Sequence, residues 1–251
     1  MNVVYKRLRE QFDRAQTARA GRPRRLGVEL KFPLVTPEGS AAGEDCVEAL
    51  WEHLGSVGWK KVRDEMTGTI VGARTPGPQN DTVASCETGY CKPEFSLAHS
   101  DGLDALAEQV RVLAYQLRPY CQAQGARFLG YGIQPITPPS DCLLMKKTRT
   151  SVWDKVFGAN RCLPPQDGDD VCLFTINAAS HVHVSVSEAE AVTAVNVLNA
   201  FAPAQLALTA NSPDGHLTRC LAVGMNDFLT KPFNVDQLRR ALARWRVQTI
   251  A

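Results

Sequence analysis

The sequence has no long hydrophobic run. No apolar stretch in the 251 residues approaches the roughly 20 residues that a membrane-spanning helix needs. Residues 1–16 also lack the continuous apolar segment of a secretory signal. We therefore expect a cytoplasmic protein with no membrane partner.

Paired cysteine motifs and internal repeats are absent as well. The chain has eight cysteines, none of them in a C-x-x-C pair. Cys86 and Cys91 lie five apart with no matching second pair, which argues against a structural zinc site. Without a signal segment, we expect reduced thiols rather than disulfides.

The overall composition is that of an ordinary globular protein, with 44% apolar and 22% charged residues. The net charge of +2 is unevenly distributed, because residues 1–25 hold eight Lys and Arg against two Asp and Glu. This basic helical N-terminal arm could contact an acidic surface. A solvated amphipathic helix explains the same pattern better, and we expect no nucleic-acid partner.

Hydrophobic periodicity predicts mixed α and β structure. Residues 26–35 form a strand with Val28, Leu30 and Phe32 on one face and Glu29 and Lys31 on the other. Residues 82–98 are typical of strand, turn, strand. Apolar spacing predicts helices over 3–18, near 47–54 and from 100 onward. Ser100 or Asp101 would cap the third of these helices. The apolar face of the second helix consists of Val47, Leu50, Trp51 and Leu54.

The second half of the chain continues this alternation. Residues 171–187 suggest a β-hairpin or a long strand, and Ser187 with Glu190 matches a capping box. The helix that follows would bury one face, and residues 205–213 would form a short buried strand. The residues of that buried helix face are Ala191, Val195, Leu198 and Ala202.

Three carboxylates on predicted strands are candidate metal ligands. Glu29 sits mid-strand, and Glu87 and Glu94 lie seven apart across a glycine turn. Burying an unpaired carboxylate costs several kcal/mol, so these side chains should face a cleft or a cation. They could converge on Mg²⁺, which favours oxygen ligands. The alternative is three solvated acids at strand edges.

Two further patterns are candidate binding elements. Lys146, Lys147 and Arg149 follow a proline-rich loop and could neutralise phosphate, although a solvated basic turn has the same composition. His181 and His183 alternate with valines and therefore share one strand face. They could bind a metal or a substrate, or belong to an ordinary polar sheet face.

The order of these segments resembles the glutamate–cysteine ligase family of the plant and proteobacterial type, the carboxylate–amine ligases. The resemblance covers about residues 26–213, and it is carried by LGVELKFPLV, ETGYCKPEFSLA, GARFLGYGIQP, MKKTR, NAASHVHVSVS and LNAFAPAQLALTANSP. It implies an α+β fold of the glutamine-synthetase type, here incomplete: a curved, mostly antiparallel sheet with helices on one face.

The resemblance also implies roles. Glu29, Glu87 and Glu94 match acids that lie near a metal ion in the family. Arg149 matches a catalytic cation that faces phosphate or glutamate, and Lys146 and Lys147 match basic residues that bind the nucleotide. His181 and His183 match the polar strand face that lines the substrate site. One departure is Lys31, which stands where the family often has a second acid; a lysine there subtracts a metal ligand or substitutes its own charge for a cation.

The C-terminal segment departs further. Residues 205–247 resemble the last third of a two-component response-regulator receiver domain, with Thr209 and Lys231 at its phosphate-contacting positions. No upstream segment resembles the receiver's acidic pair or phosphoacceptor aspartate. We therefore predict a chimeric chain: an arm over 1–25, a partial ligase-like domain over 26–213 and a short α/β receiver-like fragment over 214–251.

The predicted function is ATP- and Mg-dependent ligation of the glutamate γ-carboxylate to cysteine or a similar amine through an acyl-phosphate. Loss of the distal part of the domain would impair this activity or abolish it. The alternative is a phosphorelay fragment that partners a histidine kinase but lacks its phosphoacceptor.

Overall fold

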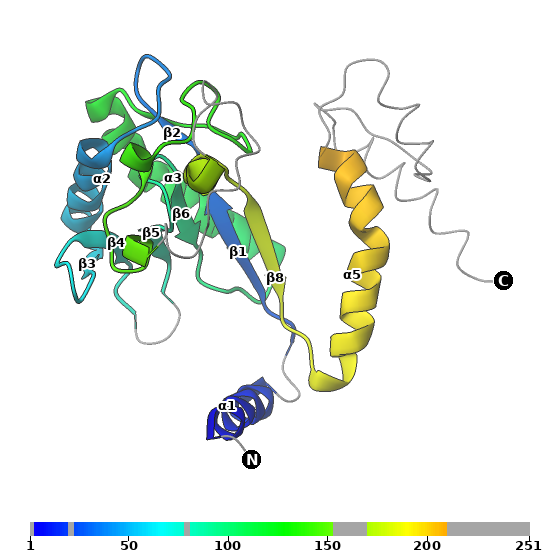
Figure 1. The fold of residues 1–251 in the computed structure, drawn as a ribbon. Coiled ribbons are helices and arrows are strands. Elements are labelled where there is room, and N and C mark those ends of the chain that lie inside the picture. The colour runs from blue at the N-terminus through cyan, green and yellow to red at the C-terminus, as the bar shows by residue number, and fades with distance from the viewer. Residues whose placement is uncertain (1–2, 20–22, 78–80, 153–169, 210–251) are drawn as a thin grey trace. The chain divides into compact units, whose positions relative to one another are not determined.

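The computed structural model describes residues 3–19, 23–77, 81–152 and 170–209 (Figure 1). The chain divides into two compact units. One comprises residues Arg22–Ser185, and the other joins Met1–Gly21 to Val186–Ala251. The predicted receiver-like fragment over 214–251, including Lys231, lies outside the described residues.

A six-stranded sheet organises the unit Arg22–Ser185. Its order is β3-β4-β5-β6-β1-β8, and every pairing within it is antiparallel. The strands are β1 (Leu26–Lys31), β3 (Lys60–Arg63), β4 (Ile70–Arg74), β5 (Val83–Cys86), β6 (Pro93–Ser96) and β8 (Ser180–Val184). A separate pair joins β2 (Leu34–Val35) to β7 (Arg127–Phe128). The strand predicted over 26–35 is thus interrupted at Phe32 and Pro33, because proline has no N–H to offer a ladder.

Helices α2 (Glu44–Ser56) and α3 (Leu103–Gln124) cover one face of this sheet (Figure 1). The apolar face of α2 is confirmed, since its four predicted core residues are completely buried. In α3, Leu106, Leu113 and Leu117 are buried. The predicted cap is wrong: Gly102 occupies the N-cap without a side-chain hydrogen bond, and Gly125 ends the helix in the left-handed region at φ 65°.

The hydrophobic core lies between these helices and the sheet. Val28 and Leu30 of β1 pack against it, together with Phe95 of β6. Because side chains alternate along a strand, Glu29 and Lys31 must lie on the opposite face. The predicted division of this strand into an apolar and a polar face is confirmed.

The segment before β8 differs from the prediction. Residues Asp170–Thr175 form a 3₁₀ helix, and only Ser180–Val184 are extended, so there is no hairpin over 171–187. Thr175 Oγ1 donates a hydrogen bond to the Cys172 carbonyl oxygen at 2.6 Å. Such local side-chain bonds stabilise a turn in place of a strand ladder.

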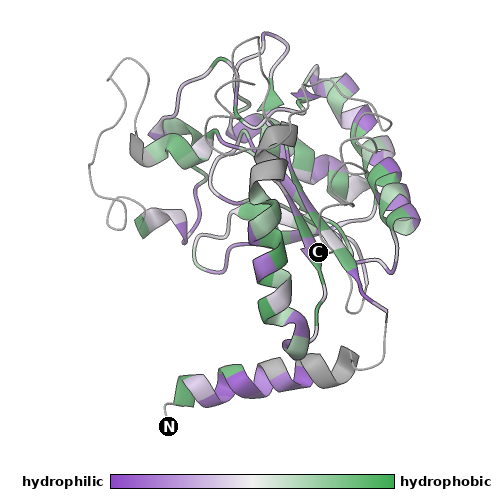
Figure 2. Ribbon diagram, turned by 90° about the vertical axis from the view of Figure 1, so that its right-hand side faces the viewer, coloured by the Kyte–Doolittle hydropathy of each residue, from purple (hydrophilic) through white to green (hydrophobic). Residues whose placement is uncertain are grey.

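The other unit contains α1 (Val3–Arg19) and α5 (Glu188–Thr209). The capping box is present, since Glu190 Oε2 accepts hydrogen bonds from the Ser187 N–H and hydroxyl at 3.0 and 2.8 Å. Figure 2 shows α1 as largely hydrophilic and α5 as largely hydrophobic. Val195 and Leu198, on the predicted buried face of α5, are more than half exposed.

Helix α5 also replaces a predicted strand. It continues through Thr209, where a receiver-like strand was expected. Alanine and leucine, which are frequent in this part of the helix, are strong helix formers. The described helices include none with the length and apolar character needed to cross a lipid bilayer.

Candidate functional site

The sheet face opposite α2 and α3 carries four of the predicted site residues: Glu29, Glu94, His181 and His183. Strand register places them there, because Glu29 lies opposite Ser96 on one side and His181 on the other. Lys31 lies directly opposite Glu94. Residues opposite one another in antiparallel strands point to the same face, so β6, β1 and the edge strand β8 form one polar surface.

Glu29 is bound by both predicted histidines. Its Oε2 lies 2.8 Å from His181 Nδ1, and its Oε1 lies 3.3 Å from His183 Nε2. The strand register produces this arrangement, since β8 pairs with β1 and its alternate residues share a face. The prediction that the two imidazoles share a face is therefore confirmed. Both imidazoles are half-exposed, so they can also contact a ligand.

Glu87 and Glu94 are joined by Lys31. Lys31 Nζ lies 2.8 Å from Glu87 Oε2 and 2.8 Å from Glu94 Oε2. Burial lowers the pKa of Lys31, but its hydrogen bond to Glu87 and the charges of both carboxylates outweigh burial, and the net shift is upward. For Glu87, burial raises the pKa, while the hydrogen bond and charge of Lys31 turn the net shift downward. The ion pair between Lys31 and Glu87 therefore favours the charged form of both groups.

Three further cations surround Glu87. Lys92 is buried and donates to Asn177 Oδ1 at 3.0 Å, and Lys147 Nζ donates to the Cys86 carbonyl oxygen at 2.6 Å. Burial lowers the pKa of both lysines. The positive charges of Lys92 and Arg149 both act on the Glu87 carboxylate. With Lys31, these residues form a cluster that we call the cation cluster: Lys31, Lys92, Lys147 and Arg149.

Arg149 is the exposed member of the cation cluster. Its guanidinium makes no hydrogen bond or ion pair with any residue that the structure describes. A guanidinium offers five N–H donors in a planar fork that matches phosphate and carboxylate oxygens. Arg149 is therefore well suited to receive an anion.

Lys146 does not join the cation cluster. Its ammonium pairs instead with Glu44 at the start of α2, whose other oxygen accepts a hydrogen bond from the Tyr90 hydroxyl at 2.8 Å. The hydrogen bond to Glu44 raises the pKa of Lys146. The predicted basic triplet is thus divided, because the chain turns at Lys147, where the Thr150 N–H donates to the Lys147 carbonyl oxygen at 3.0 Å.

Asp64 anchors the segment that carries Lys147 and Arg149. Thr148 donates to it twice, from Oγ1 at 2.6 Å and from its backbone N–H at 3.0 Å. The side-chain hydrogen bond of Thr148, followed by the backbone N–H of Thr67, holds the pKa of Asp64 well below its usual range. Asp64 therefore positions the basic segment. Sequence reasoning did not predict this role, because Asp64 and Thr148 are 84 residues apart along the chain.

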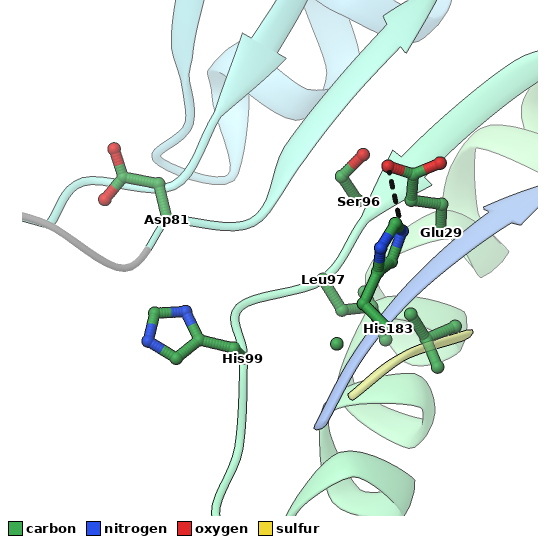
Figure 3. A pocket seen from close by; sticks show the side chains of 8 residues that line it. Glu29, Asp81, Ser96, Leu97, His99 and His183 are labelled. Atoms are coloured by element: carbon green, nitrogen blue, oxygen red, sulfur yellow. Dashed lines mark ion pairs between the residues drawn. The ribbon is translucent and has the colours of Figure 1, made fainter. Parts of the chain in front are cut away.

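A pocket of about 350 Å³ adjoins Glu29 and His183 (Figure 3). The figure shows these two side chains joined across the sheet face, with Asp81 and His99 nearer the other end. Asp81 Oδ1 is buried and has no hydrogen-bond partner in the part of the chain that the structure describes. The members of the cation cluster are absent from this pocket's lining, so the polar face has an acid–histidine part and a cationic part.

The predicted metal ligands do not form one cluster. Glu29 contacts imidazoles, whereas Glu87 and Glu94 share Lys31. Among the described residues, no group of three or more His, Cys, Asp or Glu is arranged to hold a metal ion. Glu87 and Glu94 do not fit a metal ion while Lys31 lies between them, which leaves Glu29 as the carboxylate free of lysine.

Sequence reasoning missed Lys92, Asn177 and Asp64 and left Lys31 without a partner. One signal was available for Lys92, because it lies two residues before Glu94, immediately ahead of β6. Asn177 gave no such signal. It meets Lys92 only through the fold, from 85 residues away.

The predicted cysteine chemistry is consistent with the structure. Each cysteine that the structure describes is a free thiol. Cys86 and Cys91 are buried and donate to carbonyl oxygens of Tyr90 and Thr175. Burial raises the pKa of Cys91 to about 11, so this thiol is unreactive at neutral pH.

Taken together, fold and site define an α+β protein with an antiparallel sheet that presents a polar face with an acid–histidine part and a cationic part. The family model described as glutamate-cysteine ligase family 2 (GCS2) matches residues 25–215. The chain therefore belongs to glutamate-cysteine ligase family 2. The match includes Thr209, the residue that a receiver-like reading would assign to phosphate contact.

A search among curated proteins gives a relative in Rubrobacter xylanophilus named "Putative glutamate--cysteine ligase 2-3". It is 29% identical to this chain over 207 residues, which is 81% of this chain. The chain spans 48% of that relative's length.

Proposed function

We propose that this chain is an ATP-dependent carboxylate–amine ligase of the glutamate–cysteine type. The observation that carries the proposal is the cation cluster on the polar sheet face of a GCS2 family member. Lys31 contacts Glu87 and Glu94, and the charges of Lys92, Lys147 and Arg149 interact with Glu87, so the local charge is positive and favours an anionic ligand. ATP phosphates and the glutamate carboxylate are ligands of this kind.

The chemistry proceeds in two balanced steps. An oxygen of the glutamate γ-carboxylate attacks the γ-phosphorus of ATP, the bond to ADP breaks, and an acyl-phosphate forms. The nitrogen of cysteine, or of a similar amine, then attacks the acyl carbon, phosphate leaves, and the nitrogen loses a proton. The first step brings two anions together, so fixed positive charge between them lowers its barrier.

The described residues suit separate parts of this reaction. Arg149 would contact the transferred phosphoryl group or the glutamate carboxylate, and Lys147 the nucleotide phosphates. Lys146 is held by Glu44 and would contribute only at longer range. His181 and His183 would contact substrate on the acid–histidine part of the face.

A magnesium ion that accompanies the nucleotide would supply further neutralisation of phosphate charge. Glu29 is the predicted ligand that best suits this ion, because its carboxylate contacts imidazoles rather than a lysine. Of the predicted ligands Glu29, Glu87 and Glu94, we therefore propose Glu29 alone as a ligand of this ion.

Calorimetric titration of ATP into Arg149→Met tests the proposal. Loss of a charge-assisted contact should weaken ATP binding by about tenfold or more. The matched control is Arg111→Met, because Arg111 is exposed on α3 and pairs with Glu108. ADP release with glutamate, cysteine and Mg²⁺ then measures turnover. An absence of ATP binding to the wild-type chain would refute the proposal, as would equal affinities in both variants.

A further inference from the structure

The point between Glu87 and Glu94 has the features of a small cation site. The two carboxylates come from different elements, Glu87 from the turn after β5 and Glu94 from β6. The Oε2 atoms of both carboxylates lie 2.8 Å from one shared position between them. The side chain of Glu94 is only 8% exposed, so its charge needs a partner inside the protein.

Lys31 Nζ occupies that position. The cross-strand register places Lys31 directly opposite Glu94, and the side chain of Lys31 is only 11% exposed. Glu94 uses its other oxygen to accept a hydrogen bond from Ser96 Oγ at 2.9 Å. The Oε2 atom has no hydrogen-bond donor of good geometry, and its partner is the lysine charge.

The geometry of the pair is close to that of a divalent-ion site. A Mg²⁺ ion binds carboxylate oxygens at 2.0–2.1 Å, so an ion at the Nζ position would need each oxygen to move inward by about 0.7 Å. While Lys31 is present, however, its charge together with those of the surrounding cations opposes a divalent ion. Lys92 and Arg149 already act on Glu87, and Lys31 acts on Lys92.

We infer that Lys31 is a built-in replacement for a metal ion at Glu87 and Glu94, where its ammonium takes the place of a divalent cation. The site then holds one positive charge that cannot dissociate or be removed by a chelator. Two of the three N–H donors of Lys31 face the carboxylates. The third has no partner among the described residues and can donate to a phosphate or carboxylate oxygen of a ligand.

This inference deepens the proposed ligase function, but the test of the inference does not depend on that function. Binding of Mn²⁺, used as a probe for Mg²⁺, is measured on the full chain without nucleotide or amino acid. A chain that fails to bind ATP can still pass or fail this test, so the two proposals are separable.

The first comparison uses Lys31→Met, which keeps the length of the side chain and removes its charge. We expect Lys31→Met to bind one more Mn²⁺ ion per chain than the wild type, and Lys31→Met with Glu87→Gln to lose it. Electron paramagnetic resonance of free Mn²⁺ gives the stoichiometry. The matched control is Lys61→Met, because Lys61 pairs with a single carboxylate, Glu52, and should gain no ion.

The second comparison needs no change at Lys31. Glu87→Gln in the wild-type background should leave Mn²⁺ affinity unchanged, because Lys31 already fills the site. A fall of tenfold or more would overturn the inference, since it would mean that Glu87 binds metal beside the lysine. A folded Lys31→Met chain that gains no Mn²⁺ would overturn it as well. If Lys31→Met fails to fold by circular dichroism, the Glu87→Gln comparison decides alone.

Discussion

A single residue, Lys31, changes what the polar face of β1 can bind. The family resemblance led us to expect an acid at this position, and the lysine instead neutralises Glu87 and Glu94. Lys92 adds a second buried positive charge two residues before Glu94. At the scale of residues, the site is therefore suited to anions because its acids are already paired.

Asp64 supports a pH prediction at the same scale. Its folded-state pKa is depressed by hydrogen bonds from Thr148 and Thr67. A carboxyl with a depressed pKa adds stability above its unfolded pKa of about 3.9 and loses this contribution as the pH falls through the folded value. We expect Asp64→Asn to be less stable than wild type, by a constant margin above about pH 5 that shrinks between about pH 4 and pH 2.

Urea unfolding at several pH values measures that margin. Glu65→Gln is the control, because Glu65 is the exposed neighbour of Asp64 and makes no hydrogen bond or ion pair with any described residue. A margin that stays constant down to pH 2 would contradict the assigned hydrogen bonds.

At the scale of elements, the turn between β5 and β6 determines where the cation cluster forms. Gly89 in this turn bridges to Leu144, and its Cα lies against the backbone of Thr175. It thus joins the turn with Glu87, the segment before the basic residues and the 3₁₀ helix ahead of β8. These three segments lie far apart in sequence, and only their packing brings the charges together.

We expect Gly89→Ala to destabilise the fold. A Cβ at this position would overlap the Thr175 carbonyl oxygen, which belongs to backbone and cannot rotate away. Overpacking of this kind costs about 1–3 kcal/mol, and it should also weaken ATP binding because the turn carries Glu87. Thermal unfolding and calorimetry measure the two effects. Gly130→Ala is the control, since a Cβ there meets open space, and equal stabilities of the two variants would disprove the close packing.

At the scale of the whole molecule, the core and the candidate site belong to one unit. The hydrophobic core, the six-stranded sheet and the cation cluster all lie within Arg22–Ser185. The helices α1 and α5 belong to the other unit, and the apolar side chains that are described on them are largely exposed. Folding and ligand binding should therefore depend mainly on residues 22–185.

Expression of residues 22–185 alone tests this division. Because the fragment keeps the complete core, we expect one cooperative urea transition within about 1 kcal/mol of the full chain's main transition. Its ATP affinity should match that of the full chain within about threefold, since it contains Lys147 and Arg149. A fragment without a cooperative transition would show that α1 or α5 contributes to the core.

The amino-acid sequence by itself determined which residues share a face. Period-two alternation separates Glu29 and Lys31 from Val28 and Leu30, and helical spacing selects the buried side of α2, because both patterns follow from backbone geometry. The order of its segments also pointed to the glutamate–cysteine ligase family.

Only the tertiary structure decided which charges meet. Strand register placed Lys31 opposite Glu94, and the packing of distant loops placed Lys92 beside Asn177 and Thr148 beside Asp64. Local patterns carry no information on such pairings, because the partners are 63 to 85 residues apart and meet only when the sheet and its loops close around one core. The same long-range packing joined Glu87 and Glu94 to a lysine rather than to Glu29, which is why the predicted arrangement of three acids did not form.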